Sequence, residues 1–134
     1  MRVMGHNALA IIVAAIAIYA VGFLIFGLLL SDAWVAATGY TKEQLESGMS
    51  KMPIGFVIPI LLAIGLSLAV KWRNQPGWMG GVVTGALVAL FLTFPQFLYG
   101  YVYSPAGGET LLAIDALHTF AGCIVGGAIL GAWK

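Results

Sequence analysis

Residues 8–30 read ALAIIVAAIAIYAVGFLIFGLLL, an apolar run that contains no charged side chain. A bilayer core about 30 Å thick is crossed by roughly 20 apolar residues in helical conformation. The run is too long for the apolar core of a signal peptide, which spans roughly 7 to 15 residues. It therefore predicts a first membrane span rather than a cleaved leader, although Arg2 precedes it.

Three further apolar segments of similar length follow, at 53–70, 78–102 and 109–133. The 134-residue chain is 61% hydrophobic and only 8% charged, whereas a soluble domain carries roughly a quarter of its residues as charged side chains. A transmembrane β-barrel would instead show alternating segments of about ten residues. The composition therefore predicts an all-α fold, an integral membrane four-helix bundle that forms a single transmembrane domain over residues 1–134.

The connection between the first two spans, residues 31–52, holds most of the polar side chains. Within it, Thr41-Lys42-Glu43-Gln44 matches a capping box, in which the threonine hydroxyl and the glutamine side chain satisfy free amides at a helix start. We expect a short interfacial helix here. Pro53 then suits the first turn of the second span, where its missing N–H costs nothing.

Basic residues are unevenly divided between the two sides of the predicted bundle. Four fall on one side and two on the other: Arg2, Lys71, Arg73 and Lys134 against Lys42 and Lys51. Cytoplasmic loops carry the excess of lysine and arginine. The count therefore predicts a multi-pass protein of the bacterial inner membrane with both termini in the cytoplasm. Tryptophan and tyrosine gather near the span ends, as in aromatic belts.

Small residues in the last two spans indicate how these helices pack. The turn between them is short, so residues at equal distance from it lie at equal depth in an antiparallel pair. Gly81 and Gly85 form one GxxxG pair and Gly127 and Gly131 form another, and the pairings 81 with 131 and 85 with 127 give the same sum of residue numbers. Since GxxxG glycines let helix backbones approach closely, we expect the two spans to touch there.

Farther from the termini, polar residues match in depth by the same rule, Gln96 with Asp115 and Thr93 with His118. Together with Tyr99 they form the candidate polar cluster. Ionisable groups inside a membrane are expensive, face the bundle interior and commonly mark function. One interpretation is a proton relay or polar ligand site; the other is an interhelical hydrogen-bond cluster that only stabilises packing. The sequence leaves both open.

Other chemistry finds little support in the sequence. The single Cys123 lies in an apolar run. His6 precedes the first span and His118 lies in the last one, so the local spacing of these residues does not predict a zinc site. No serine stands in a nucleophile elbow, and no phosphate-binding loop is present. A net charge of +1 provides no basic arm for nucleic acid. We expect no enzyme activity, catalytic residue, metal or cofactor, and no nucleic-acid partner.

Several features recur in a characteristic order along nearly the whole chain. They are Asn7, Gly22, Phe26-Gly27, Trp34, Gly39, the predicted helix at 41–46, Met52-Pro53 and the closing GGAILGAW at 126–133. In this order the chain resembles a family of small bacterial four-span membrane proteins, the domain-of-unknown-function family numbered 1761. Members often carry an aromatic-Tyr-Gly sequence where this chain has Ile25-Phe26-Gly27. The resemblance implies the four-span topology and no activity.

Three functions fit these observations. The leading hypothesis is a structural or accessory subunit that forms homo-oligomers or joins a larger membrane complex, with membrane lipids as its surroundings, because glycines beyond the hairpin leave close-packing surface. The alternative is a small transporter or channel with a polar path at Asp115 and His118. The second alternative is a module that binds a lipid or hydrophobic ligand in an apolar cleft beside Tyr99 and Phe97.

Overall fold

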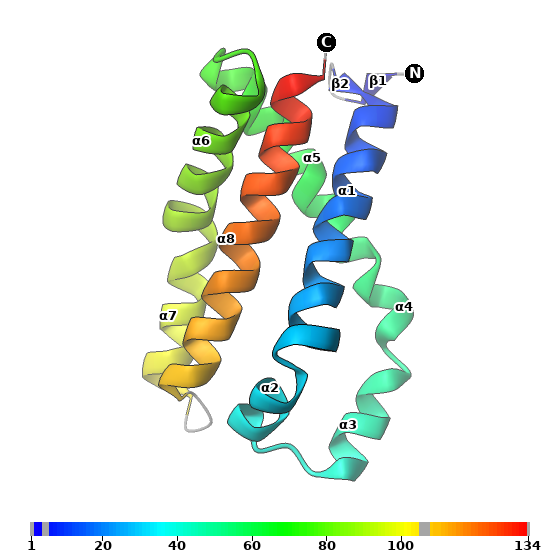
Figure 1. Cartoon of the computed structure of the whole chain (residues 1–134), viewed down its shortest axis with the longest axis vertical. Coiled ribbons are helices and arrows are strands. Elements are labelled where there is room, and N and C mark those ends of the chain that lie inside the picture. The colour runs from blue at the N-terminus through cyan, green and yellow to red at the C-terminus, as the bar shows by residue number, and fades with distance from the viewer. Residues whose placement is uncertain (1, 4–5, 105–107, 134) are drawn as a thin grey trace.

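The computed structural model describes residues 2–3, 6–104 and 108–133. Within these residues, four helices are long and apolar enough to cross a membrane: Ala8–Leu29, Met52–Arg73, Trp78–Tyr103 and Glu109–Ala132. They run side by side as a bundle (Figure 1). The predicted fold class, an all-α membrane four-helix bundle with a short extra helix between the first two spans, is confirmed.

The first span consists of helix α1 (Ala8–Gly22) and the π-helical segment η1 (Phe23–Leu29). It begins where the Asn7 side chain accepts a hydrogen bond from the Leu9 amide, 3.0 Å away, because an asparagine oxygen satisfies one of the free amides of a first helical turn. Two short antiparallel strands, β1 (Arg2–Val3) and β2 (His6–Asn7), precede the span.

Between the first two spans lie α2 (Ser31–Thr38) and α3 (Lys42–Met49). Gly39 ends α2 in the left-handed conformation, with φ of 65°, which glycine adopts without steric cost. Both hydrogen bonds of the predicted capping box are present at α3, joining Thr41 and Gln44 at 2.9 and 3.3 Å. The turn between the two helices contains Tyr40.

The second span comprises α4 (Met52–Gly55) and α5 (Val57–Arg73), and a tight turn leads from it into the third. The turn is held from both sides. The Arg73 guanidinium donates to the Thr84 hydroxyl at 2.9 Å, and the Gly77 amide donates to the Gly131 carbonyl at 3.0 Å. These bonds tie the second, third and fourth spans together at this end of the bundle.

The third span is formed by α6 (Trp78–Val88), the π-helical segment η2 (Ala89–Thr93) and α7 (Phe94–Tyr103). Pro95 has no N–H to donate and crowds the preceding turn. The helix widens just before it, since the Phe94 amide and the Thr93 hydroxyl both bond the Ala89 carbonyl, the hydroxyl at 2.8 Å. The fourth span is the single helix α8 (Glu109–Ala132).

The closest packing in the bundle joins α6 to α8. A Cβ added at Gly81 would overlap the Gly127 carbonyl oxygen, and one at Gly131 would lie 2.6 Å from the Gly77 carbonyl oxygen. A Cβ at Gly85 would likewise overlap the Cys123 carbonyl oxygen. We call Gly81, Gly85, Gly127 and Gly131 the glycine seam. Only glycine allows two backbones to approach so closely.

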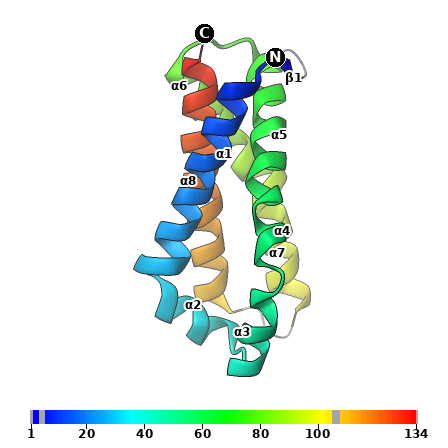
Figure 2. The same ribbon diagram turned by 90° about the vertical axis from the view of Figure 1, so that its right-hand side faces the viewer.

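The bundle has two different ends. Both chain termini and the α5–α6 turn lie at one end, and α2, α3, the end of α7 and the start of α8 lie at the other, as Figures 1 and 2 show. We call these the terminal end and the α3 end. Between them the core is closed by side chains with no exposed surface or almost none: Ala10, Ala14, Ala63, Leu66, Ala89, Cys123 and Leu130.

Candidate functional site

A pocket of about 190 Å³ lies at the α3 end of the bundle. We call it the Asp115 pocket. Its lining comes from the α2–α3 turn, α7, α8 and the residues next to these two helices. It includes Tyr40, Gln96, Phe97, Tyr101, Ser104 and Asp115. Because Ser104 and Gly108 belong to the connection between α7 and α8, the pocket is at the end of the bundle and not in its core.

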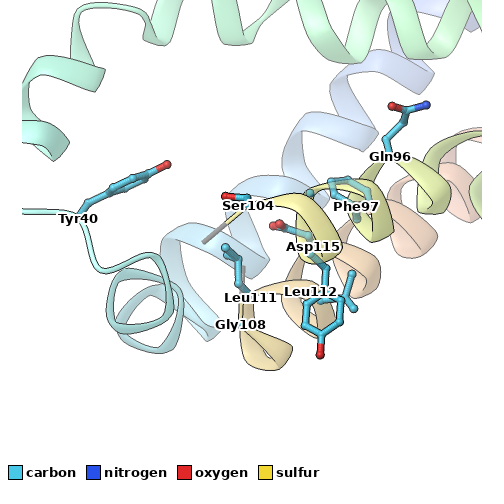
Figure 3. A pocket seen from close by; sticks show the side chains of 10 residues that line it. Tyr40, Gln96, Phe97, Ser104, Gly108, Leu111, Leu112 and Asp115 are labelled. Carbon is cyan, nitrogen blue, oxygen red and sulfur yellow. The ribbon is translucent and has the colours of Figure 1, made fainter. Parts of the chain in front are cut away.

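Asp115 places a carboxylate in this pocket. It lies six residues into α8, about 9 Å from the helix start at 1.5 Å per residue, and it is half-buried. Figure 3 shows its carboxylate on the side that faces Tyr40 across the pocket. Among the residues that the structure describes, no hydrogen bond or ion pair reaches it. A carboxylate that is partly withdrawn from water is stabilised by a partner, and the pocket has room for one.

Tyr40 is held over the pocket by a row of aromatic contacts. Its ring meets Trp34 edge to face at 6.5 Å between centroids, Trp34 meets Phe26 at 5.7 Å, and Phe26 meets His118 at 4.6 Å. We call these four side chains the aromatic row. Aromatic pairs at such distances contribute about 0.5–1.5 kcal/mol each beyond burial. The row therefore links the α2–α3 turn to η1 and α8.

His118 belongs to this row and is not among the described residues that line the Asp115 pocket. Besides Phe26 it touches α1, since a Cβ added at Gly22 would lie 3.0 Å from its Nε2. No hydrogen bond joins His118 to Asp115 in the described residues. The two ionisable groups, expected to act together, therefore face different neighbours: His118 faces the first span and Asp115 faces α7 and the α2–α3 turn.

The remaining members of the candidate polar cluster also separate. Gln96 lines the Asp115 pocket, but its amide extends away from the carboxylate (Figure 3). Thr93 donates to the Ala89 carbonyl of its own helix. Tyr99 is 67% exposed and its ring contacts Tyr103. The side-chain hydrogen bonds expected between the third and fourth spans are therefore not made within the described residues.

Of the two residues beside which an apolar cleft is expected, Phe97 lines the Asp115 pocket and Tyr99 does not. An apolar groove of about 310 Å³ lies between α1 and α5, where Tyr19 stacks on Phe56 with centroids 4.6 Å apart. In the described residues no group of three histidine, cysteine, aspartate or glutamate side chains is placed to hold a metal ion.

The family model described as "Protein of unknown function (DUF1761)" matches residues 9–131. The chain belongs to this family. The match covers all four spans of the DUF1761 protein, together with the turn that carries Tyr40 and the helix that carries Asp115. No curated protein and no solved structure matches the chain. The family description assigns no activity, so the function has to be inferred from the site.

The aromatic row gives a first testable prediction. Trp34→Ala removes the contacts to both Phe26 and Tyr40, so we expect it to lower the free energy of unfolding by about 1–3 kcal/mol, from two aromatic pairs. Thermal unfolding in detergent, followed by circular dichroism, measures the change. Trp72→Ala is the matched control, because Trp72 is 78% exposed. Equal losses in both variants would show that the row does not stabilise the fold.

Proposed function

We propose that this DUF1761 protein is a non-enzymatic binding protein that takes a small polar solute into the Asp115 pocket. The observation that supports this most directly is the carboxylate of Asp115, which lines a pocket without a partner among the described residues. If the half-buried Asp115 carboxylate only stabilised helix packing, we would expect it to be hydrogen-bonded to a neighbouring helix. The lining of the pocket, as far as the structure describes it, contains no histidine, cysteine or second carboxylate, which favours binding over catalysis.

The proposal places the protein in the bacterial plasma membrane with both termini in the cytoplasm. The basic residues at the termini and in the α5–α6 turn support this orientation through the positive-inside rule. The termini and that turn share one end of the bundle (Figure 1), and the Asp115 pocket lies at the opposite end. In this orientation the pocket opens toward the outside of the cell.

Binding is favoured over passage through the bundle. Toward the terminal end, α6 and α8 touch backbone to backbone along the glycine seam, and Leu66 and Cys123 are fully buried in the core. His118, one turn beyond Asp115 on α8, is packed against Phe26 and Gly22. Between Asp115 and the terminal end, the closely packed helices therefore leave no path for a solute.

Thiol labelling on intact cells tests the pocket. In a Cys123→Ala background, we expect a membrane-impermeant maleimide to label Asp115→Cys and to leave His118→Cys unlabelled. Leu117→Cys is the matched control on the same helix, because Leu117 is 53% exposed on the outer surface of the bundle and lipid keeps its thiol from the reagent. Protection of Asp115→Cys would refute the proposed site. Labelling of His118→Cys at the same rate would establish a water path and favour a channel.

Two further positions report the orientation in the same experiment. Gly48→Cys in α3, where nothing lies within 4 Å of an added Cβ, should be labelled on intact cells. Gln75→Cys in the exposed α5–α6 turn should be labelled only after the membrane is permeabilised. The reverse result would show that the termini face outward and that the pocket opens to the cytoplasm.

A second candidate function, that of an accessory subunit that assembles with copies of itself, is favoured by one observation. Most described glycines of the four spans have atoms within 4 Å of an added Cβ, but Gly55, Gly65 and Gly100 have none, and Gly65 is exposed in the middle of α5. Small exposed residues in a span favour contact with another helix. Oxidation of Gly65→Cys in a Cys123→Ala background should then give disulfide-linked dimers in membranes, and Val83→Cys, exposed on α6, should give none. Monomers from both variants would refute self-assembly through this face.

A further inference from the structure

We propose that the solute bound at the Asp115 pocket is an organic ammonium cation. This rests on the proposed function and specifies the chemistry of its ligand. The pocket combines the Asp115 carboxylate of α8 with three aromatic rings from two other parts of the chain: Tyr40 on the α2–α3 turn, and Phe97 and Tyr101 on α7. Carboxylate and aromatic rings together recognise positive charge spread over an apolar group.

The charged groups that line the pocket indicate a ligand with a single positive charge. Among the described residues that line the pocket, Asp115 is the only one with an acidic side chain, and none is a lysine, arginine or histidine. A single carboxylate in a partly apolar site is compensated by one positive charge. A neutral solute would leave the carboxylate unpaired beside it, and an anion would be repelled by it.

The aromatic rings distinguish an organic cation from a metal ion. Divalent and transition metal ions need several oxygen, nitrogen or sulfur ligands, and the described residues contain no such group. Ring faces instead attract cations within about 6 Å of the centroid, most effectively those with a weakly hydrated apolar surface. Methylated ammonium groups have this property.

The size of the pocket agrees with a small ligand. A volume of about 190 Å³ is well above the roughly 10–15 Å³ that a single water needs in a cavity. The pocket therefore has room for a ligand of several non-hydrogen atoms, such as tetramethylammonium or choline. Figure 3 shows Tyr40 and Asp115 on opposite sides of the pocket, so that a cation in the pocket would lie between the two side chains.

The aromatic row explains how an exposed turn supplies a defined ring. Tyr40 is 52% exposed, but its contact with Trp34, and through Phe26 with His118, holds the ring in place. A ring held before the ligand arrives loses less conformational entropy on binding. His118 is therefore a positioning residue for the site and does not contact the cation.

Calorimetry on the full chain in nanodiscs tests the inference with defined probes. We expect tetramethylammonium and choline to bind more tightly than 3,3-dimethylbutan-1-ol, the uncharged carbon isostere of choline, because only the cations pair with the Asp115 carboxylate. The expected difference is about tenfold, which corresponds to about 1.4 kcal/mol. Asp115→Asn should weaken choline binding about tenfold or more. Tyr40→Leu should weaken it severalfold, whereas Tyr40→Phe should preserve it, because the ring and not the hydroxyl attracts the cation.

The control is Tyr103→Leu, because Tyr103 lies on the same helix as Tyr101, is 72% exposed and does not line the pocket. It should leave choline affinity unchanged. Equal binding of the uncharged isostere, or no binding of either cation while Asp115→Cys is labelled from outside, would overturn the ammonium inference and leave the pocket standing. Protection of Asp115→Cys would instead refute the proposed function itself.

Discussion

Gly85→Ala is expected to be strongly destabilising for so small a substitution. The added Cβ would overlap the Cys123 carbonyl oxygen and lie 3.1 Å from the Ile124 Cα. Both are backbone atoms and cannot turn aside as a side chain could, so α6 and α8 must separate. Overpacking of this kind costs about 1–3 kcal/mol or more. The expected result is a clear fall in the thermal unfolding temperature in detergent.

Gly100→Ala is the matched control in the same span, because nothing lies within 4 Å of an added Cβ there. Alanine in an open helical position is favoured over glycine by about 1 kcal/mol, so Gly100→Ala should be neutral or stabilising. A comparison of unfolding temperatures and of the monodisperse fraction after purification separates the two variants. If Gly85→Ala unfolded at the same temperature as Gly100→Ala, the backbone contact along the glycine seam would not hold the hairpin together.

Asp115→Leu is expected to raise stability while it abolishes solute binding. The carboxylate is half-buried and has no partner among the described residues, so its replacement by an apolar side chain removes a desolvation cost. An aspartate at the membrane centre costs about 2.5–3.5 kcal/mol. Because Asp115 lies nearer the helix start, we expect a gain of about 1 kcal/mol, measured as a higher unfolding temperature.

The opposite behaviour is expected at Thr84, which provides a control for a polar group that does hold helices together. Its hydroxyl accepts from Arg73 at 2.9 Å and donates to the Gly80 carbonyl at 2.7 Å, and the side chain is buried. Thr84→Val should therefore lower stability by about 1 kcal/mol or more. If Asp115→Leu were equally destabilising, the carboxylate would be a packing contact and not a free group in a binding site.

The depth of residues in the antiparallel pair formed by the third and fourth spans could be predicted from the sequence, because it depends only on the length of the turn and the helical rise per residue. A short turn and a constant rise of 1.5 Å per residue bring Gly81 level with Gly131, and the structure places both at the contact of α6 and α8. The long apolar runs determine the spans for the same reason, since the required length depends only on bilayer thickness.

The facing of the polar residues could not be predicted in this way. Three residues along a helix turn through about 300°, which leaves two side chains about 60° apart. This angle is enough to direct Asp115 into the pocket beside α7 and His118 onto Phe26 of the first span. Which neighbour each one meets depends on the rotation of α8, and that is fixed by contacts along the whole bundle.

Tyr40 was missed as a site residue because its position comes from tertiary structure. In the sequence it is one of several aromatic residues near a span end. It reaches the pocket because Gly39 turns the chain with φ of 65° and because Trp34 and Phe26 support its ring. The glycine before it was the available signal, since left-handed turns favour glycine.

Chemical modification of the native carboxylate tests most directly whether Asp115 is open to water outside the cell. Right-side-out vesicles treated with a water-soluble carbodiimide and an amine would be digested and examined by mass spectrometry. Glu43 and Glu46 on the exposed helix α3 serve as internal controls and should react fully. We expect Asp115 to react as well, and choline to slow its reaction and not theirs. An unmodified Asp115 beside fully modified Glu43 and Glu46 would contradict an outward-facing pocket.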